Sequence, residues 1–380
     1  MISPNPIAST IILIFGVQAL VLSVLLLLKH PRRQSNFFLA LLLFFFALLT
    51  VNIGMANILF SYDLINVFRY VQLELLFGIG PALYFFTKSI TDPDYRISKK
   101  EYIHFIPVVL EFIFYRTEIY RVGANGWYQR PIHPFTMVYM VEQWLGVISI
   151  SVYILLSVYL LIKYRQWINS KYSNLKNKTL GWLRIPIFIY SGFWLVWMIV
   201  TKIDYYVFQS AFKEFYFLPT FIGLSFITTW IGFKGYVKSQ ADVSGFLKTS
   251  IKTEPSPSNP EEAKLITDLM DTHKPYLNPD LDLQKLSELA GMNPKTISRI
   301  INQDLHMNFY EFVNKHRVEE FKQRLQKPNH DQLTLLGHAF ECGFNSKSTF
   351  NHIFKKYTDQ TPREYYIKLK NESERKHSDD

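Results

Sequence analysis

The hydrophobic and polar positions of this chain follow two different patterns. From Met1 to about Ile231 the chain consists of long apolar runs, rich in aromatic residues and separated by short polar connections. After about Ser239 the apolar residues recur every three or four positions, which is typical of amphipathic helices in a soluble protein. The pattern therefore predicts an all-α chain with one half in a membrane and one half outside it.

Seven stretches of the first half are apolar enough to be membrane-spanning helices. A spanning helix needs about 20 mostly apolar residues, because the hydrocarbon core is about 30 Å thick. The fourth stretch is the weakest, since Pro107 and Glu111 interrupt it. We predict a seven-span sensor domain over residues 1–237, with spans at about 7–28, 37–60, 70–90, 102–117, 135–162, 185–203 and 216–233.

The connections between these stretches differ in their Lys and Arg content. Cytoplasmic connections carry an excess of these residues. With seven spans, one set of connections holds 15 of them and the opposite set holds 6. The connection 163–184 contributes most, with six basic residues and no acidic ones. This distribution predicts an N-terminus outside the cell and a C-terminal half in the cytoplasm.

A few side chains of the membrane half are candidates for sensing a ligand. Ionisable groups at membrane depth are costly, face the interior of a helix bundle and often mark a ligand or ion pathway. The alternative is that they lie near the interface, where water and aromatic residues are expected. The candidates are Glu74, His104, Glu111 and, in the outer connection 116–134, Trp127.

The two halves are joined by a polar linker at residues 238–260. It gathers Ser, Thr and Pro, and ends in alternating prolines between Glu254 and Pro260. Alternating prolines cannot continue a helix and favour extended backbone. We expect a tether that is semi-rigid at its proline-rich end.

The soluble half begins with the sequence pattern of a helix-turn-helix. An amphipathic helix from about Glu261 is followed by a short helix that ends at Gly291, and glycine is the favoured residue just beyond a helix end. Asn293 can cap a new helix, with Pro294 at its first position. A short helix, a glycine-containing turn and a capped helix together form a helix-turn-helix.

The same pattern recurs some fifty residues later. A short helix through Ala339 leads to the turn Cys342-Gly343-Phe344, and Asn345 or Ser346 can cap a second candidate recognition helix. Apolar residues over 309–325 predict one long helix between the two units. Two such units on a rigid helix can enter successive major grooves, about 34 Å apart, on one face of DNA.

Residues 261–370 resemble the DNA-binding domain of the AraC/XylS family of bacterial transcription regulators. The family's usual glycine after each recognition helix is replaced by His306 and Asp359, and both positions are expected to be left-handed. The stretches 80–84 and 104–107 also resemble bacterial multi-span sensor regions that are fused to DNA-binding domains. The resemblance to AraC/XylS regulators is carried by Leu286, Leu289-Ala290, Ile297-Ser298-Arg299, Phe309, His316-Arg317-Val318, Ala339, Gly343-Phe344, Ser346, Thr349-Phe350, Phe354-Lys355-Lys356, Thr361-Pro362 and Tyr365.

The outward faces of the two recognition helices carry the candidate DNA contacts. Arg and Lys suit guanine edges, Asn suits adenine, and Ser or Lys suits phosphates. The alternative is a solvated polar face, which every amphipathic helix has. With Ile297, Ile300 or Ile301, Phe350 and Phe354 facing inward, the projecting residues are Lys295, Ser298, Arg299, Asn302, Lys347, Ser348, Asn351, His352 and Lys355. The family resemblance implies base contacts by Lys295, Ser298, Arg299, Ser348 and His352.

Net charge and composition limit the classes of function that the sequence supports. The net charge is +10, but residues 1–260 hold 23 basic and 12 acidic side chains, while residues 261–370 hold 16 and 15. The excess therefore belongs to the membrane half and is no argument for DNA. Cys342 is the only cysteine, which excludes a disulfide framework and a cysteine-built zinc site. Without a phosphate-binding loop, dinucleotide fingerprint or nucleophile motif, we expect no enzyme activity, no cofactor and no metal.

These patterns lead to one main hypothesis and two alternatives. The main one is a regulator in the bacterial inner membrane. It binds promoter DNA under the control of an extracytoplasmic or membrane ligand. The family resemblance implies that a homodimer is one possible state. The second is a transporter or channel, using carboxylates such as Glu74 and Glu111, with a regulatory cytoplasmic domain. The third keeps DNA binding and makes the bundle only an anchor. Residues 371–380 are expected to form a polar tail.

Overall fold

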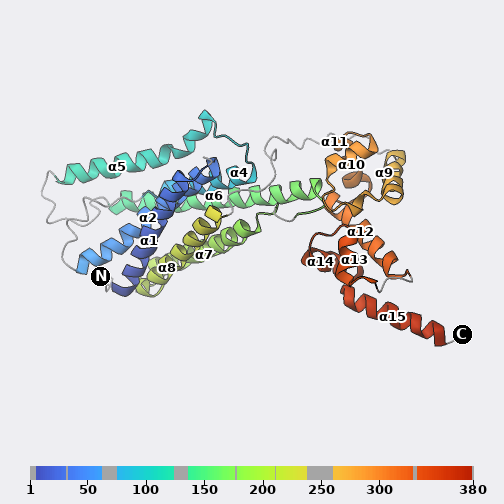
Figure 1. Ribbon diagram of the computed structural model, residues 1–380. Coiled ribbons are helices and arrows are strands. Elements are labelled where there is room, and N and C mark those ends of the chain that lie inside the picture. The colour runs from blue at the N-terminus through green and yellow to red at the C-terminus, as the bar shows by residue number, and fades with distance from the viewer. Residues whose placement is uncertain are drawn as a thin grey trace. The chain divides into compact units, whose positions relative to one another are not determined.

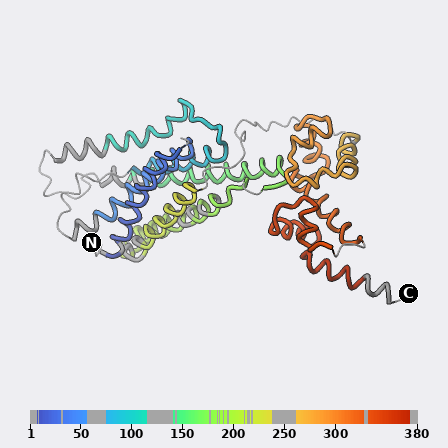
Figure 2. Tube along the Cα trace, in the orientation of Figure 1, coloured from blue at the N-terminus to red at the C-terminus, as the bar shows by residue number. Residues whose placement is uncertain are grey.

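The computed structural model describes residues 6–30, 33–61, 75–123, 136–175, 178–209, 211–237, 260–327 and 332–378 (Figure 2). Within these ranges the chain is helical and contains no β-strand, apart from one isolated antiparallel bridge between Tyr172 and Asp282. Two compact units are present. The first comprises Met1–Lys163 and Leu180–Thr249, and the second comprises Tyr164–Thr179 and Ser250–Asp380. The predicted linker, up to residue 259, lies outside the described residues.

The apolar stretches of the first half form long helices. Each predicted span overlaps one of them in the part of the span that the structure describes. The helices are α1 Pro6–Leu28, α2 Gln34–Ser61, α4 Leu76–Thr91, α5 Ile106–Gly123, α6 Thr136–Lys171, α7 Gly181–Val207 and α8 Lys213–Val237.

The fourth predicted span differs from the structure at its start. Residues Lys99–Phe105 form a 3-10 helix (η1), and α5 begins only at Ile106. Pro107 consequently lies in the first turn of α5, where its missing N–H breaks no hydrogen bond. The proline therefore begins the α-helix instead of interrupting it.

Glycine allows close helix packing within the first unit. A Cβ atom on Gly54 of α2 would lie 3.0 Å from the carbonyl oxygen of Ser9 in α1, and one on Gly235 of α8 would lie 2.3 Å from Leu39 of α2. Small residues at such contacts are typical of helices that pack in membranes. Figure 1 shows α1, α2, α7 and α8 running side by side. Helix α8 contacts α1, α2 and α7, and α1 also contacts α2.

Three helices in the described part of the chain are long and apolar enough to cross a membrane. Their apolar segments are Ser9–Leu28, Gln34–Met55 and Trp144–Lys171. Large apolar side chains on their outer faces are exposed, among them Ile14, Val21 and Leu155. The predicted arrangement of seven membrane spans stays a prediction.

The second unit is built from short helices around one longer helix. The predicted connecting helix is present as α12 over Phe309–Leu325. Helix α15 continues through residues 371–378 of the predicted polar tail. The elements are α9 Pro260–His273, η3 Pro275–Leu277, α10 Leu283–Ala290, α11 Pro294–Arg299, η4 Ile300–Asp304, α12, α13 Leu335–Glu341, α14 Lys347–Thr358 and α15 Pro362–Ser378.

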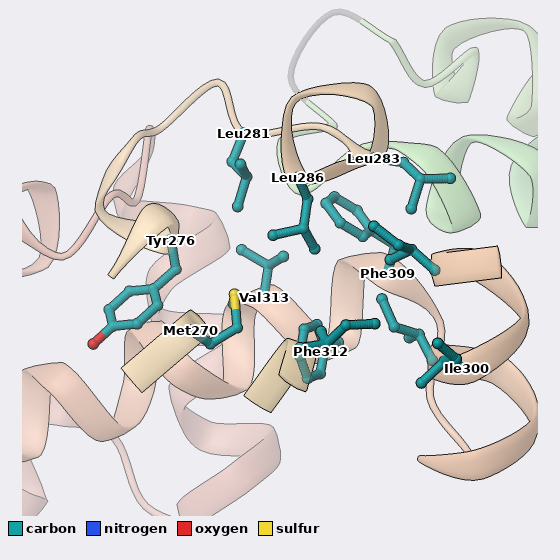
Figure 3. Close-up of a cluster of buried hydrophobic side chains, with 12 residues drawn as sticks. Met270, Tyr276, Leu281, Leu283, Leu286, Ile300, Phe309, Phe312 and Val313 are labelled. Carbon is teal, nitrogen blue, oxygen red and sulfur yellow. The ribbon is translucent and has the colours of Figure 1, made fainter. Parts of the chain in front are cut away.

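Helix α12 contributes to two separate hydrophobic cores. Its first half packs Phe309, Phe312 and Val313 into a core shared with α9, α10 and α11, which Figure 3 shows in close-up. Its second half packs Val318 and Phe321 into a core shared with α13 and α14. Because each core belongs to one helix-turn-helix, α12 supports both helix-turn-helix units.

Candidate nucleic-acid interface

The first helix-turn-helix is fixed by caps at its helix ends, of which the sequence predicts those at Gly291 and Asn293. The side chain of Asp282 accepts a hydrogen bond of 2.9 Å from the backbone N–H of Lys285 at the start of α10. Gly291 ends this helix in the left-handed conformation, with φ of 64°. Asn293 then caps α11 by accepting a 2.9 Å bond from the N–H of Lys295. The predicted glycine turn and asparagine cap are both confirmed.

The second helix-turn-helix repeats this arrangement. Thr334 caps α13, and Ser346 caps α14 by accepting a 3.2 Å bond from the N–H of Thr349, which decides between the two cap residues that the sequence left open. Gly343 in the turn has φ of 90°, and a Cβ atom there would lie 2.3 Å from the carbonyl oxygen of Tyr276. Both conformation and space therefore require glycine at this position.

The two departures from the family pattern are left-handed, as expected. His306 has φ of 52° and Asp359, which follows α14, has φ of 56°. This conformation costs a residue with a Cβ about 1–2 kcal/mol, and somewhat less for Asp or Asn. The substitutions therefore keep the turn geometry at some cost in stability.

The first recognition helix ends in a π-helical turn, which the sequence reasoning did not anticipate. This turn, Ile300–Asp304, buries Ile300 and Ile301 together in the core. The wider turn leaves Asn302 and also Gln303 exposed, so Gln303 joins the polar surface although it was not a predicted contact. The signal was the pair of adjacent isoleucines, since the sequence pattern placed only one of them inward.

The four predicted DNA contacts of the first helix-turn-helix do not all project from the domain. Lys295 and Asn302 are exposed, and Asn302 donates a 2.6 Å bond to the carbonyl oxygen of Ser298, which brings these two side chains together. Arg299 instead turns towards α9, where its Nη2 donates a 2.7 Å bond to Glu262. Only 10% of its side chain is exposed. Arg299 is thus engaged within the domain.

The five predicted DNA contacts of the second helix-turn-helix are all exposed. Lys347, Ser348, Asn351, His352 and Lys355 lie on one polar side of α14, opposite the buried Phe350 and Phe354. The adjacent Lys356 is held differently, because its Nζ lies 2.6 Å from a carboxylate oxygen of Glu311 on α12. The exposed set combines cations, hydroxyl, amide and imidazole groups, which can bond to phosphates and to base edges.

Two of the four candidate sensing residues lie in the described part of the first unit. His104 forms a 2.7 Å hydrogen bond through Nδ1 with the hydroxyl of Tyr153. Glu111 is buried and accepts bonds of 2.7 and 3.2 Å from the backbone N–H groups of Leu76 and Phe77 at the start of α4. Glu74 and Trp127 lie outside the described residues.

Comparison with known proteins agrees with this geometry. Residues 286–366 match the family described as a helix-turn-helix domain. An uncharacterised HTH-type transcriptional regulator of Staphylococcus aureus strain COL is 30% identical over 107 residues, which are 28% of this chain and 14% of that protein. The multiple antibiotic resistance protein MarA of Salmonella typhimurium is 27% identical over 106 residues, 28% of this chain and 81% of MarA. No solved structure matches the chain.

The C-terminal part of this protein therefore contains a helix-turn-helix domain, and over 107 residues it is similar to part of an HTH-type transcriptional regulator. The chain spans about 14% of the length of the staphylococcal relatives, so the likeness concerns this domain only. The residues before 261 have to be interpreted from their own sequence and structure.

Proposed function

We propose that this protein is a membrane-anchored one-component transcription regulator, which binds promoter DNA through its two helix-turn-helix units under control of its transmembrane sensor domain. The observation that carries the proposal is the pair of complete, capped helix-turn-helix units on one helix, α12. Each unit presents a polar recognition face, and two rigidly joined units can occupy neighbouring major grooves.

The proposed DNA contacts follow from the chemistry of these faces. Lys295, Lys347 and Lys355 are suited to phosphates or guanine, Asn302 and Asn351 to adenine, and the hydroxyls of Ser298 and Ser348 to phosphates or bases. His352 lies in the middle of the second face. Arg299 belongs to the proposed contacts only once it has left Glu262, because a guanidinium bonded within the domain cannot also grip a base edge.

The membrane half supports a location in the bacterial inner membrane. Its long helices carry exposed apolar side chains, and its basic residues gather on one set of connections. Seven spans with the N-terminus outside put the DNA-binding domain in the cytoplasm. Such a bundle can control DNA binding if a ligand prefers one of its states.

The transporter alternative receives less support from the structure. It relies on carboxylates within the bundle, but Glu111 is engaged at the start of α4 by two backbone N–H groups. This arrangement gives the carboxyl group a structural role as a helix cap. Uptake of substrates by vesicles that contain the protein, abolished by Glu111→Gln, would favour a carrier.

The proposal is tested by genome-wide crosslinking of the full-length protein to DNA in its native cells. We compare the natural protein with Lys295→Ala/His352→Ala, which removes one exposed side chain from each recognition face. The matched control is Lys264→Ala/His273→Ala, which removes the same two residue types from exposed positions on α9. We expect discrete promoter sites with the natural protein and the control, and their loss in the recognition variant.

Two results would contradict the proposal. Sites that persist unchanged in Lys295→Ala/His352→Ala would mean that these faces do not bind DNA. An absence of enriched sites with the natural protein would remove the regulator function itself, and vesicle transport would then be the next measurement.

A further inference from the structure

The connection between α6 and α7 contributes a short segment, Tyr172–Asn174, to the second compact unit. Tyr172 forms an antiparallel bridge with Asp282, the cap residue of α10. Both the backbone N–H and the hydroxyl of Ser173 donate to the carbonyl oxygen of Leu281, the N–H at 3.4 Å. The side chain of Asn174 lies 3.4 Å from Asp280. The segment thus adds a strand-like contact to the loop that leads into the first helix-turn-helix.

The same segment completes the surroundings of a buried arginine on α12. Arg317 is 2% exposed, and its Nη1 and Nη2 lie 3.5 and 3.3 Å from the carbonyl and hydroxyl oxygens of Ser173. Asn314, also buried, donates a 3.2 Å bond to the same Ser173 carbonyl. Burial lowers the pKa of Arg317 to about 10, so the guanidinium is still charged at neutral pH. A buried cation requires acceptors, and Ser173 supplies two of them.

Arg317 also contacts the loop that precedes the first helix-turn-helix and the turn of the second. It donates 2.8 Å bonds to the carbonyl oxygens of Tyr276 and Asn278, which precede α10. On the other side, a Cβ atom on Gly343 would lie 2.9 Å from its Nε, so the turn of the second unit packs directly on the arginine. One side chain therefore connects the α6–α7 segment, the loop before the first helix-turn-helix and the turn of the second helix-turn-helix.

We propose that Tyr172–Asn174 is the coupling segment through which the membrane half controls DNA binding, an inference that rests on the proposed function. The segment continues directly from α6 and leads along the chain into α7, so a movement of either helix acts on it. Its partner surface is formed by Leu281, Asn314 and Arg317. Docking on this surface holds the two helix-turn-helix units in the arrangement that binds DNA, and undocking weakens binding.

The position of the contact allows docking and DNA binding to occur together, which is the sign that we propose for this effect. The docked segment bonds to the loop before α10 and to α12, while Lys295, Lys347 and His352 on the recognition helices are exposed in the same structure. Docking and DNA contact are therefore compatible. Because coupling between two binding events is reciprocal, DNA must strengthen docking by the same factor by which docking strengthens DNA binding.

Docking is measured by thiol crosslinking in the full-length protein in lipid nanodiscs. Asn174→Cys/Asp280→Cys is joined with a short bismaleimide, and a protease site inserted within residues 238–259 separates the halves that are not crosslinked. The natural thiol does not interfere, because Cys342 is buried and burial raises its pKa to about 12. Asn174→Cys alone is the control for unspecific reaction. We expect efficient crosslinking only in the double variant.

Coupling is measured with a promoter fragment recovered by the crosslinking experiment above. Ser173→Ala removes the hydroxyl bonds to Leu281 and Arg317, whereas the matched control Ser170→Ala removes a hydroxyl that donates to the Trp167 carbonyl of its own helix. We expect Ser173→Ala to lower the crosslinking yield and to weaken DNA binding by about five-fold or more, the usual lower range of such coupling. Saturating DNA should raise the crosslinking yield of the Asn174→Cys/Asp280→Cys protein. Cys342 protected from alkylation shows that each variant is folded.

The possible failures are distinguishable. Reduced crosslinking with unchanged DNA affinity would overturn the coupling and leave the proposed function standing, and tighter DNA binding on undocking would overturn its sign. A protein that crosslinks efficiently but binds no promoter fragment would overturn the proposed function, and this inference with it.

Discussion

The guanidinium of Arg299 donates a 2.7 Å hydrogen bond to the carboxylate of Glu262, which ties the last residue of α11 to the first turn of α9. The second guanidinium nitrogen lies 3.9 Å from Asp304. The residue that best matches a guanine contact by type is therefore already paired in the protein without DNA. In the proposed complex with DNA, Glu262 and the DNA compete for the same cation.

Glu262→Gln is expected to tighten DNA binding by about five-fold, because it removes a competing ion pair worth about 1 kcal/mol. The gain should disappear in Glu262→Gln/Arg299→Ala. Fluorescence anisotropy with a promoter fragment at fixed salt measures both effects. Glu261→Gln makes the same change of charge one residue earlier and controls for general attraction to the DNA backbone. A loss of affinity in Glu262→Gln would instead assign Arg299 to holding α9 against α11.

Two adjacent lysines of α14 should respond differently to mutation. Lys355 projects from the exposed face, whereas Lys356 is paired with Glu311. Each phosphate contact contributes about 0.9 to the slope of log affinity against log salt. Lys355→Ala should therefore reduce this slope by about one and weaken binding, while Lys356→Ala leaves the slope unchanged. Loss of the half-exposed Lys356–Glu311 pair should cost at most about 1 kcal/mol of stability.

Salt titrations of the two variants provide a direct comparison, since both remove one positive charge from the same helix. Equal slopes in Lys355→Ala and Lys356→Ala would show that the charge of α14 acts as a whole and that the orientation of its side chains does not matter. A larger effect of Lys356→Ala would place DNA on the other side of the helix.

The parts of the domain that the sequence predicted well depend on neighbours within a few residues. The caps by Asn293 and Ser346 and the left-handed Gly291 follow from hydrogen bonds and backbone sterics that are local. The left-handed His306 and Asp359 were predictable for the same reason, once the position of the family's usual glycine was known.

The parts that escaped prediction depend on residues far apart in the chain. Whether Arg299 points outward or to Glu262 is decided by a contact between positions 37 residues apart. The contact of Ser173 with Arg317 joins positions 144 residues apart, and no periodicity reports such a pairing. The π-helical turn arises because the core accepts Ile300 and Ile301 together, which is a matter of tertiary packing.

Gly343 and Gly291 are expected to differ in their tolerance of alanine. Both are left-handed, so alanine at either position loses about 1 kcal/mol to backbone strain. At Gly291 no atom lies within 4 Å of the added Cβ, whereas at Gly343 the Tyr276 carbonyl oxygen and Arg317 Nε lie at 2.3 and 2.9 Å. Gly343→Ala should therefore cost several kcal/mol, in the range of overpacked cores or more.

Urea unfolding of the full-length variants, followed by alkylation of Cys342, measures this difference, because Cys342 belongs to the second core. Gly343→Ala should also lower the crosslinking yield of the coupling segment, since it displaces Arg317. Similar stability losses in the two variants would mean that the turn of the second helix-turn-helix moves away from Arg317 without cost in free energy.

The folding stability of the second compact unit should fall in acid because of Glu320. This carboxylate is buried on α12 and receives bonds from Lys274 at 2.7 Å, Arg324 at 2.9 Å and Tyr276 at 3.1 Å. Burial alone would raise the pKa of Glu320, but the hydrogen bonds from Lys274 and Arg324 outweigh it and hold the pKa below its ordinary value. The unfolded chain therefore binds more protons in acid, and folding stability is lost as the pH falls below about 4.3 and through the folded pKa.

Glu320→Gln should remove this part of the acid sensitivity and lower stability at neutral pH by about 2 kcal/mol, the value of a hydrogen-bonded charged group. Glu319→Gln is the matched control, because Glu319 is exposed and pairs with Lys322 one turn away on the same helix. Urea unfolding between pH 3 and pH 7, followed with a pyridyl disulfide that reacts with Cys342 in acid, measures the dependence. An equally steep loss of stability in Glu320→Gln and in the natural protein would place the acid-sensitive group elsewhere, and would reduce Glu320 to a packing role between α12 and the loop at Lys274.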